Sequence, residues 1–141
     1  MDIKGSYTLI TKLNKNYKIT IGKLGTFLFP KGFYVYSGSA LNDLNSRINR
    51  HYSSKKKFHW HIDYLLKHAK VIDTVIIPTE RRLECYLHNI VQNLLEAKIL
   101  IAKFGSADCK CKSHLVYFKK LNVKALKAKI QSNINNLTLK K

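Results

Sequence analysis

Hydrophobic and polar residues alternate along the first third of the chain, and this alternation predicts β-strands. Residues 5–12 and 17–23 alternate clearly, and the turn-forming sequence LNKN separates them. Residues 24–32 are apolar but are broken by Pro30 and Gly32, which favours an irregular edge strand or a loop. Together with a strand expected from Phe33, these segments predict a small antiparallel meander.

The stretch FYVYSGSALNDLNSRINRH, residues 33–51, predicts a strand, a tight turn and a helix. Its aromatic and β-branched residues favour a strand that ends at Gly38 and places Tyr34 and Tyr36 on one face. A helix is expected at about residues 43–52. The turn between them would expose backbone N–H groups, which suits the binding of a phosphate.

In that helix, Leu44, Ile48 and Tyr52 recur every four residues and form an apolar stripe that would face the core. Arg47 and His51, also four residues apart, then lie together on the adjoining face. A phenol from the strand and these two side chains are therefore expected to converge beside the turn.

Amphipathic helices and short strands follow in the second half of the chain, which predicts an α/β domain of the α+β type. The clearest helix covers residues 80–96, and Glu84 lies at the border between its core-facing and solvent-facing sides. The apolar stripe of this helix consists of Leu83, Leu87, Ile90 and Leu94. The other predicted elements are a helix from His61 with Ile62, Leu65, Leu66 and Ala69 in the core, strands at 71–78, 98–104 and 114–118, a turn at 105–113, a helix at 123–133 and a fraying end at 135–141.

The charge of the chain favours a polyanionic partner. Twenty-six Lys and Arg residues against eight Asp and Glu residues give a net charge of +18, and nucleic acid is the commonest biological polyanion. A membrane surface is the rival partner, but the basic residues are spread along the whole chain instead of lying on one amphipathic helix. We therefore expect a nucleic-acid partner and no membrane.

Length and composition fit one domain, because 141 residues that are 45% hydrophobic can supply an ordinary core. We expect this domain to cover residues 1–120, with residues 121–141 as its basic C-terminal helix and tail. No apolar leader and no window of about 20 apolar residues are present, which predicts a soluble, intracellular protein of the cytoplasm or nucleoid. Three cysteines without an export signal argue against a disulfide framework.

The order of several motifs resembles that of the GIY-YIG nuclease superfamily. These motifs are GSYTLI from Gly5, FYVYSGSA from Phe33, an arginine and a histidine four residues apart on the next helix, and a lone glutamate on a later helix. HWHIDYLL and FGSADCKCKSHLVYF resemble a small branch that also occurs joined to endonuclease III. The resemblance extends to about Phe118, and it departs from the two name motifs at Ser6 and Ser37, which replace isoleucines.

This resemblance implies a compact domain with a central three-stranded antiparallel sheet flanked by helices. It also implies a metal-dependent endonuclease that uses one Mg²⁺ or Mn²⁺ ion and leaves 5′-phosphate and 3′-hydroxyl ends. DNA is the expected substrate, RNA and branched or damaged DNA are the alternatives, and DNA repair is the expected context.

The resemblance also assigns roles by position. The catalytic residues would be Tyr7, Tyr36, Arg47 and His51, and the metal ligand would be Glu84. Relatives often carry a late asparagine in the domain, for which Ser106 and Asp108 are the candidate substitutes here. His114 is a further candidate for support of the active site.

The chemistry of these residue types agrees with the roles. Hydrolysis builds negative charge around phosphorus, and the planar guanidinium of Arg47 can contact a nonbridging oxygen at two points. One carboxylate, Glu84, suffices for Mg²⁺ or Mn²⁺ if waters and the phosphate supply other oxygens. Tyr7 would take the proton of the attacking water, which requires its pKa to fall from about 10. His51 is the alternative proton carrier, and Tyr36 or His51 would orient water or phosphate.

Other polar and basic residues are candidates for contacts with the nucleic acid. They are Ser39, Arg50, Lys55, Lys56, Lys57, His59 and His61. Any single lysine of this set is typical of a solvated loop, so only the group as a whole favours a surface that follows phosphates.

Cysteines and histidines allow a second kind of site. His59-x-His61 is followed much later by Cys109-x-Cys111-x-x-His114, and these residue types bind Zn²⁺ if the two segments meet. The single-residue gaps are tighter than those of a zinc knuckle. Buried thiols and hydrogen-bonded histidines are therefore the default interpretation, and a structural zinc is the alternative.

Two other functions fit the charge. The departures from both name motifs favour a nucleic-acid-binding module with the same fold and no turnover. A basic assembly protein, such as a ribosome-associated factor, explains the charge but gives Glu84 no role. A nuclease of this size can require a partner protein for targeting, and the sequence leaves the oligomeric state open.

Overall fold

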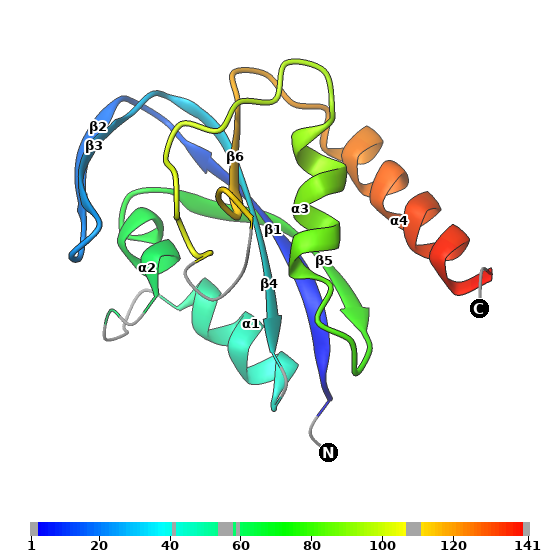
Figure 1. Ribbon diagram of the computed structural model, residues 1–141. Helices are drawn as coiled ribbons and strands as arrows, with labels where there is room; N and C mark the ends of the chain where they lie inside the picture. Colours follow the sequence, from blue (N-terminus) through cyan, green and yellow to red (C-terminus); the bar gives the residue numbers. More distant parts are fainter. Residues whose placement is uncertain (1–2, 41, 54–57, 59, 107–110, 140–141) are drawn as a thin grey trace.

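The computed structural model describes residues 3–40, 42–53, 58, 60–106 and 111–139, and it is a mixed α+β fold (Figure 1). Its main sheet has four antiparallel strands in the order β5-β1-β4-β6. The strands of this sheet are β1 (Gly5–Leu13), β4 (Gly32–Ala40), β5 (Lys70–Pro78) and β6 (Leu115–Phe118). A separate hairpin consists of β2 (Tyr17–Ile21) and β3 (Gly25–Phe29). The helices are α1 (Leu44–Tyr52), α2 (His61–Leu66), α3 (Glu84–Gln92) and α4 (Val123–Leu139).

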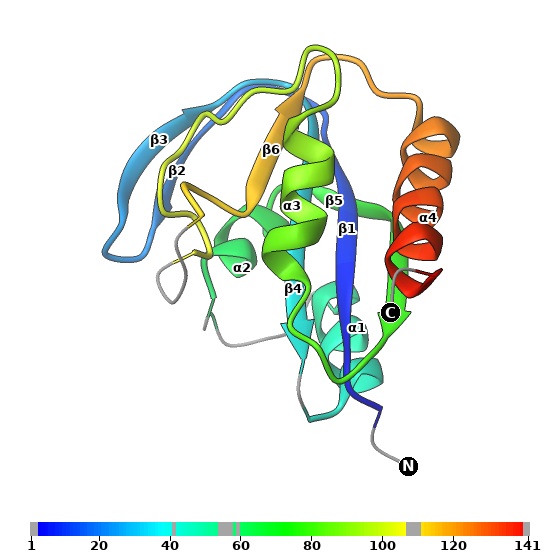
Figure 2. The ribbon, with the colours of Figure 1, turned by 45° about the vertical axis from the view of Figure 1, so that its right-hand side comes forward.

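Helices cover both faces of the sheet (Figure 2). β1 and β4 are accordingly buried on both sides and carry apolar residues facing both ways. Tyr7 and Leu9 point to the face that packs against α1, α2 and the β2–β3 hairpin. Ile10 and Val35 point to the opposite face, which packs against α3 and α4 (Figure 2). The sheet therefore separates two cores, and a site at its edge can receive side chains from both.

The described part of the chain contains no helix with the length and hydropathy of a membrane span.

The predicted N-terminal meander is wrong. The neighbours of β1 are β4 and β5, while β2 and β3 pair only with each other. Residues 24–32, expected to be irregular, contain the regular strand β3, and Pro30, which cannot donate a ladder hydrogen bond, follows its last residue. β4 and β5 flank β1 and pair with it over most of its length. The shorter β2 and β3 would form fewer ladder hydrogen bonds with β1. The sheet also has one strand more than the resemblance implied.

Gly38 does not end its strand, contrary to the sequence prediction. β4 continues to Ala40 and pairs with β1 throughout, with Gly38 opposite Tyr7. A Cβ atom on Gly38 would lie 2.7 Å from the Tyr7 hydroxyl, so the absence of a side chain lets a phenol approach the strand. The turn predicted at Gly38 is therefore absent, and the chain continues there as a strand.

The stripe predicted for α1 holds only in part. Leu44 and Ile48 are buried, but Tyr52 is 53% exposed and His51 is only 2% exposed. The helix begins after Asp43, whose carboxylate accepts a hydrogen bond from the Ser46 N–H at 3.2 Å. His51 replaces Tyr52 in the core because Tyr7 offers it a hydrogen-bond partner there, as described below.

Three elements of the second half differ from their predicted ranges. α3 covers residues 84–92 and not 80–96. The strand expected at 98–104 is absent, because only Lys98 forms a β-bridge, to Tyr117, and the following residues turn away from the sheet. α4 continues to Leu139 instead of fraying from residue 135, since Ile134 is buried against the sheet.

Candidate active site

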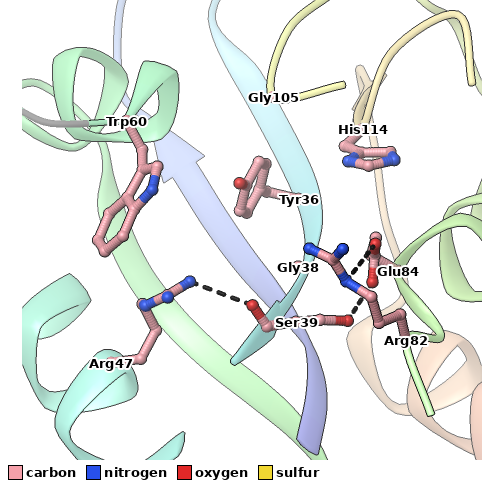
Figure 3. A pocket seen from close by; sticks show the side chains of 9 residues that line it. All are labelled: Tyr36, Gly38, Ser39, Arg47, Trp60, Arg82, Glu84, Gly105 and His114. Carbon is pink, nitrogen blue, oxygen red and sulfur yellow. Dashed lines mark hydrogen bonds and ion pairs between the residues drawn. The ribbon is translucent and has the colours of Figure 1, made fainter. Parts of the chain in front are cut away.

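A pocket lined mainly by polar and charged residues lies at an open edge of β4. β6 pairs with β4 only as far as Tyr36, and the Ser37 N–H donates to the His114 carbonyl at 3.1 Å. Residues 38–40 of β4 therefore have no strand beside them on that edge in the described chain. A pocket of about 190 Å³ opens there (Figure 3). Its lining residues are Tyr36, Gly38, Ser39, Arg47, Trp60, Arg82, Glu84, Gly105 and His114.

Glu84 stands at the first position of α3 and faces this pocket. Its carboxylate accepts a short hydrogen bond from the Ser39 hydroxyl, and Ser39 contacts the Ser6 hydroxyl at 2.7 Å. Ser6 in turn accepts the N–H of Leu83 at 2.9 Å. Serine hydroxyls of β1 and β4 therefore fix the start of α3, and the side chain of Arg82 lies 3.8 Å from Glu84. Ser6, which departs from the name motif, thus has a structural role.

Arg47 reaches the same pocket from α1. Its Nη1 donates a hydrogen bond to the Ser39 carbonyl at 3.2 Å, and its guanidinium lies 4.1 Å from the centre of the Trp60 ring. In Figure 3, Arg47 and Trp60 lie on one side of Tyr36, while Glu84 and Arg82 lie on the other. One fixed guanidinium and one carboxylate from separate helices therefore face a shared space.

Trp60 is held in place by a buried ion pair. Asp63 is completely buried and binds Arg50 at two points, with N–O distances of 2.8 and 2.9 Å. The same carboxylate accepts a hydrogen bond from the backbone N–H of Trp60 at 2.9 Å, and the Arg50 guanidinium lies 4.4 Å from the Trp60 ring centre. Arg50, a candidate for nucleic-acid contact, is thus engaged in positioning Trp60 beside Arg47.

The Asp63→Ala variant is expected to lose about 3–5 kcal/mol of unfolding free energy, because Arg50 would remain partly buried without its partner. Urea denaturation would measure this loss. The matched control is Asp73→Ala, whose salt bridge to Lys127 is more exposed and whose loss should cost less than about 1 kcal/mol. Equal losses for the two variants would contradict a buried positioning role for Asp63.

Tyr7 and His51 form a buried pair beneath the pocket. The Tyr7 hydroxyl lies 2.8 Å from His51 Nε2, and both residues are almost completely buried. Burial raises the pKa of Tyr7 from about 10 to about 12, although the nearby Arg47 charge lowers it. Burial also raises the pKa of Tyr36. Both phenols are therefore protonated near neutral pH, and Tyr7 does not have the lowered pKa that a free phenolate base requires.

The raised pKa of Tyr7 predicts a loss of stability at alkaline pH. Above pH 10 the unfolded chain releases the Tyr7 proton while the folded chain keeps it up to about pH 12, so the folded state binds more protons and is weakened as the pH rises. Two units correspond to about 3 kcal/mol, present below pH 10 and lost between pH 10 and 12. Chemical denaturation of wild type and Tyr7→Phe across this range would show a shallower decline in the variant; parallel curves would contradict the assignment.

The remaining predicted site residues do not all reach the pocket. His61 accepts the Gly105 N–H at 2.9 Å and so positions the loop that borders the pocket. His114 lines the pocket, and burial lowers its pKa while Glu84 opposes that shift. Ser106 is buried and does not line the pocket. Lys55, Lys56, Lys57, His59 and Asp108 lie outside the described residues.

Sequence reasoning missed Trp60, Arg82 and Gly105, which also line the pocket. The single tryptophan of the chain, set between two histidines after a basic loop, was a usable signal for Trp60. Arg82 precedes a predicted metal ligand by two residues and could have been named for that reason. Gly105 gave no comparable signal, because its role depends on the Tyr36 ring, which a Cβ atom on Gly105 would approach to 2.8 Å.

The chain matches a known protein family. A family model described as a domain of unknown function, DUF123, matches residues 6–138. The matched range includes every residue that lines the pocket, as well as Tyr7 and His51. No curated protein and no solved structure matches the chain.

Proposed function

Because this chain belongs to the DUF123 family, whose domain has no known function, we propose a function from the chemistry of its site: metal-dependent hydrolysis of phosphodiester bonds in DNA. The observation that carries this proposal is the meeting of Arg47 and Glu84 in one pocket of a chain with a net charge of +18. The motif order that resembles GIY-YIG nucleases supports it. DNA repair is the proposed context, and RNA or branched DNA are alternative substrates.

The surroundings of Glu84 fit one hard divalent cation, Mg²⁺ or Mn²⁺. The carboxylate is 15% exposed and faces the pocket, and the Ser39 hydroxyl provides a second oxygen beside it. Open space remains in the pocket for waters and phosphate oxygens, which such ions need to complete an octahedron. When bound, the ion would act as a Lewis acid that stabilises charge on the phosphate.

Arg47 and Tyr36 would bind the reacting phosphate. Arg47 uses Nη1 for the Ser39 carbonyl, and its planar group has further N–H donors for a nonbridging oxygen. Trp60 holds that plane in a fixed orientation, which reduces the reorganisation needed when charge develops. Tyr36, which burial keeps protonated, can donate its hydroxyl proton in a hydrogen bond to the phosphate.

Tyr7 and His51 would act together as the proton acceptor. Tyr7 does not line the pocket, but its hydroxyl lies directly behind Gly38, which does. A water that reaches it past Gly38 would pass its proton to the Tyr7 oxygen as it attacks phosphorus, while the Tyr7 proton would pass to His51 Nε2, 2.8 Å away. This exchange avoids a free phenolate, which the raised pKa of Tyr7 disfavours. The bond from phosphorus to the 3′ oxygen breaks, and that oxygen takes a proton from solvent. The products carry 5′-phosphate and 3′-hydroxyl ends.

The test is direct incubation of the purified protein with labelled single-stranded, duplex and branched DNA and with RNA, in Mg²⁺ or Mn²⁺. We expect cleavage that stops when the ion is chelated, and end-group analysis should give 5′-phosphate and 3′-hydroxyl ends. Intact substrates under all conditions, after hours with either ion, would overturn the proposal.

A second candidate function is binding without cleavage. It is favoured by the contacts of Glu84, whose carboxylate is engaged by the Ser39 hydroxyl and the Arg82 side chain. Such a module would show affinity that falls steeply with salt, as counterion release requires, and would leave substrates intact. A partner protein for targeting is compatible with both functions.

A further inference from the structure

Two cysteines lie beside a histidine that also lines the pocket. Cys85 is on the first turn of α3, while Cys111 and His114 belong to the segment that leads into β6. The two sulfur atoms and an imidazole nitrogen all lie within 4.8 Å of one another, and Cys85 Sγ is 3.3 Å from His114 Nε2. In a tetrahedral zinc site with bonds of about 2.0–2.3 Å, ligand atoms lie roughly 3.3–3.8 Å apart. Small side-chain movements would therefore bring all three onto one ion.

His88 is a second observation that points to a ligand. It is 1% exposed, and neither of its ring nitrogens has a hydrogen-bond partner among the described residues. Its ring centre lies 5.8 Å from that of His114, and it borders a cavity of about 410 Å³ together with Cys85 and Cys111. A buried imidazole without a partner is costly in a folded protein. A metal ion bound here would explain why two thiols and two imidazoles lie close together.

We propose that Cys85, Cys111 and His114 bind Zn²⁺, with the fourth position of the tetrahedron on the side of His88. Thiolate and imidazole ligands select a soft or borderline cation, whereas the oxygen donors of Glu84 and Ser39 suit Mg²⁺ or Mn²⁺. The chain would thus have two metal sites with different chemistry. The zinc set differs from the one considered from sequence: Cys85 is added, His61 is engaged by Gly105, and His59 and Cys109 lie outside the described residues.

Zinc here would have a structural role. Cys85 follows Glu84 directly, and His114 is a lining residue of the pocket. An ion held by both would fasten the start of α3 to the segment before β6 and so fix two walls of the pocket. His114 would then be a zinc ligand instead of a group that contacts substrate. This inference does not depend on the proposed nuclease activity.

The experiment measures zinc in the purified full chain by inductively coupled plasma mass spectrometry after dialysis against metal-free buffer. We expect about one zinc ion per chain, and replacement by Co²⁺ should give the thiolate-to-metal charge-transfer band and visible bands of a tetrahedral site. Wild type without zinc, and without these bands when Co²⁺ is added, would overturn the proposal. A disulfide between Cys85 and Cys111 in the purified protein would also overturn it.

The zinc content of single-residue variants would identify the ligands. Cys85→Ser and Cys111→Ser should each reduce bound zinc to a small fraction, while the control His68→Asn, which removes an exposed imidazole, should retain it. His114→Cys supplies another zinc ligand and should bind zinc if the fold is intact. Full zinc content in both serine variants would contradict the assignment. Glu84→Gln should keep its zinc, so failure of the nuclease proposal is distinguishable from failure of this one.

Discussion

Glu84→Gln is expected to lower the rate of phosphodiester cleavage by about 10³-fold. Glutamine has nearly the same size and can still accept the Ser39 hydrogen bond, so the start of α3 should be preserved. It lacks the negative charge that holds a divalent cation, and charge on the phosphate would then be stabilised by Arg47 without the ion. Single-turnover cleavage of a labelled duplex at saturating Mn²⁺ would measure the effect.

The matched control is Glu80→Gln, which removes an exposed carboxylate four residues earlier and should cleave like wild type. DNA affinity of Glu84→Gln, measured without metal, should equal or exceed that of wild type because a negative charge is lost from a basic pocket. Wild-type cleavage by Glu84→Gln would exclude Glu84 as the ligand of the catalytic ion. Loss of affinity together with cleavage would indicate damage to the fold.

Arg47→Lys is expected to lower cleavage by about 10²-fold, with a smaller change in DNA affinity. Lysine keeps the positive charge but lacks the planar fork that bonds the Ser39 carbonyl and stacks on Trp60. The charge would therefore move relative to the phosphate, and the loss should be in kcat more than in KM. Steady-state kinetics with a short duplex would separate the two.

Arg81→Lys is the control for this change, because Arg81 is an exposed arginine next to the same pocket wall. It should retain activity close to that of wild type. If Arg47→Lys were as active as Arg81→Lys, the fixed guanidinium plane would have no catalytic role. Arg47 would then serve as one of many positive charges that attract DNA.

The sequence pattern predicted on which face of its own strand or helix each candidate residue lies. The alternation around Tyr36 predicts its face of the strand, and the helical period places Arg47 beside the core stripe. Glu84 was placed beside the apolar stripe of its helix, and it stands at the first turn of α3. These positions follow from strand and helix periodicity, which the sequence displays directly.

Features that depend on contacts between distant residues were not predictable in this way. The Asp63–Arg50 pair that supports Trp60 joins two helices through a buried carboxylate, and an aspartate on a short helix gives no sign of that burial. The helical period predicted Tyr52 in the core, but Tyr52 is exposed and His51 is buried, where it forms a hydrogen bond with Tyr7. The separate β2–β3 hairpin likewise results from competition between strands for pairing with β1.

The early end of β6 has a consequence for the behaviour of the molecule in concentrated solution. A strand with unpaired backbone groups invites pairing with a strand of another chain, which is a common route to aggregation. The Ser39 carbonyl on this strand accepts a hydrogen bond from Arg47, and the guanidinium places a positive charge beside the exposed backbone. A positive charge at this edge would repel the same edge of a second copy, so the arginine that we propose to bind phosphate would also disfavour extension of the sheet by another chain.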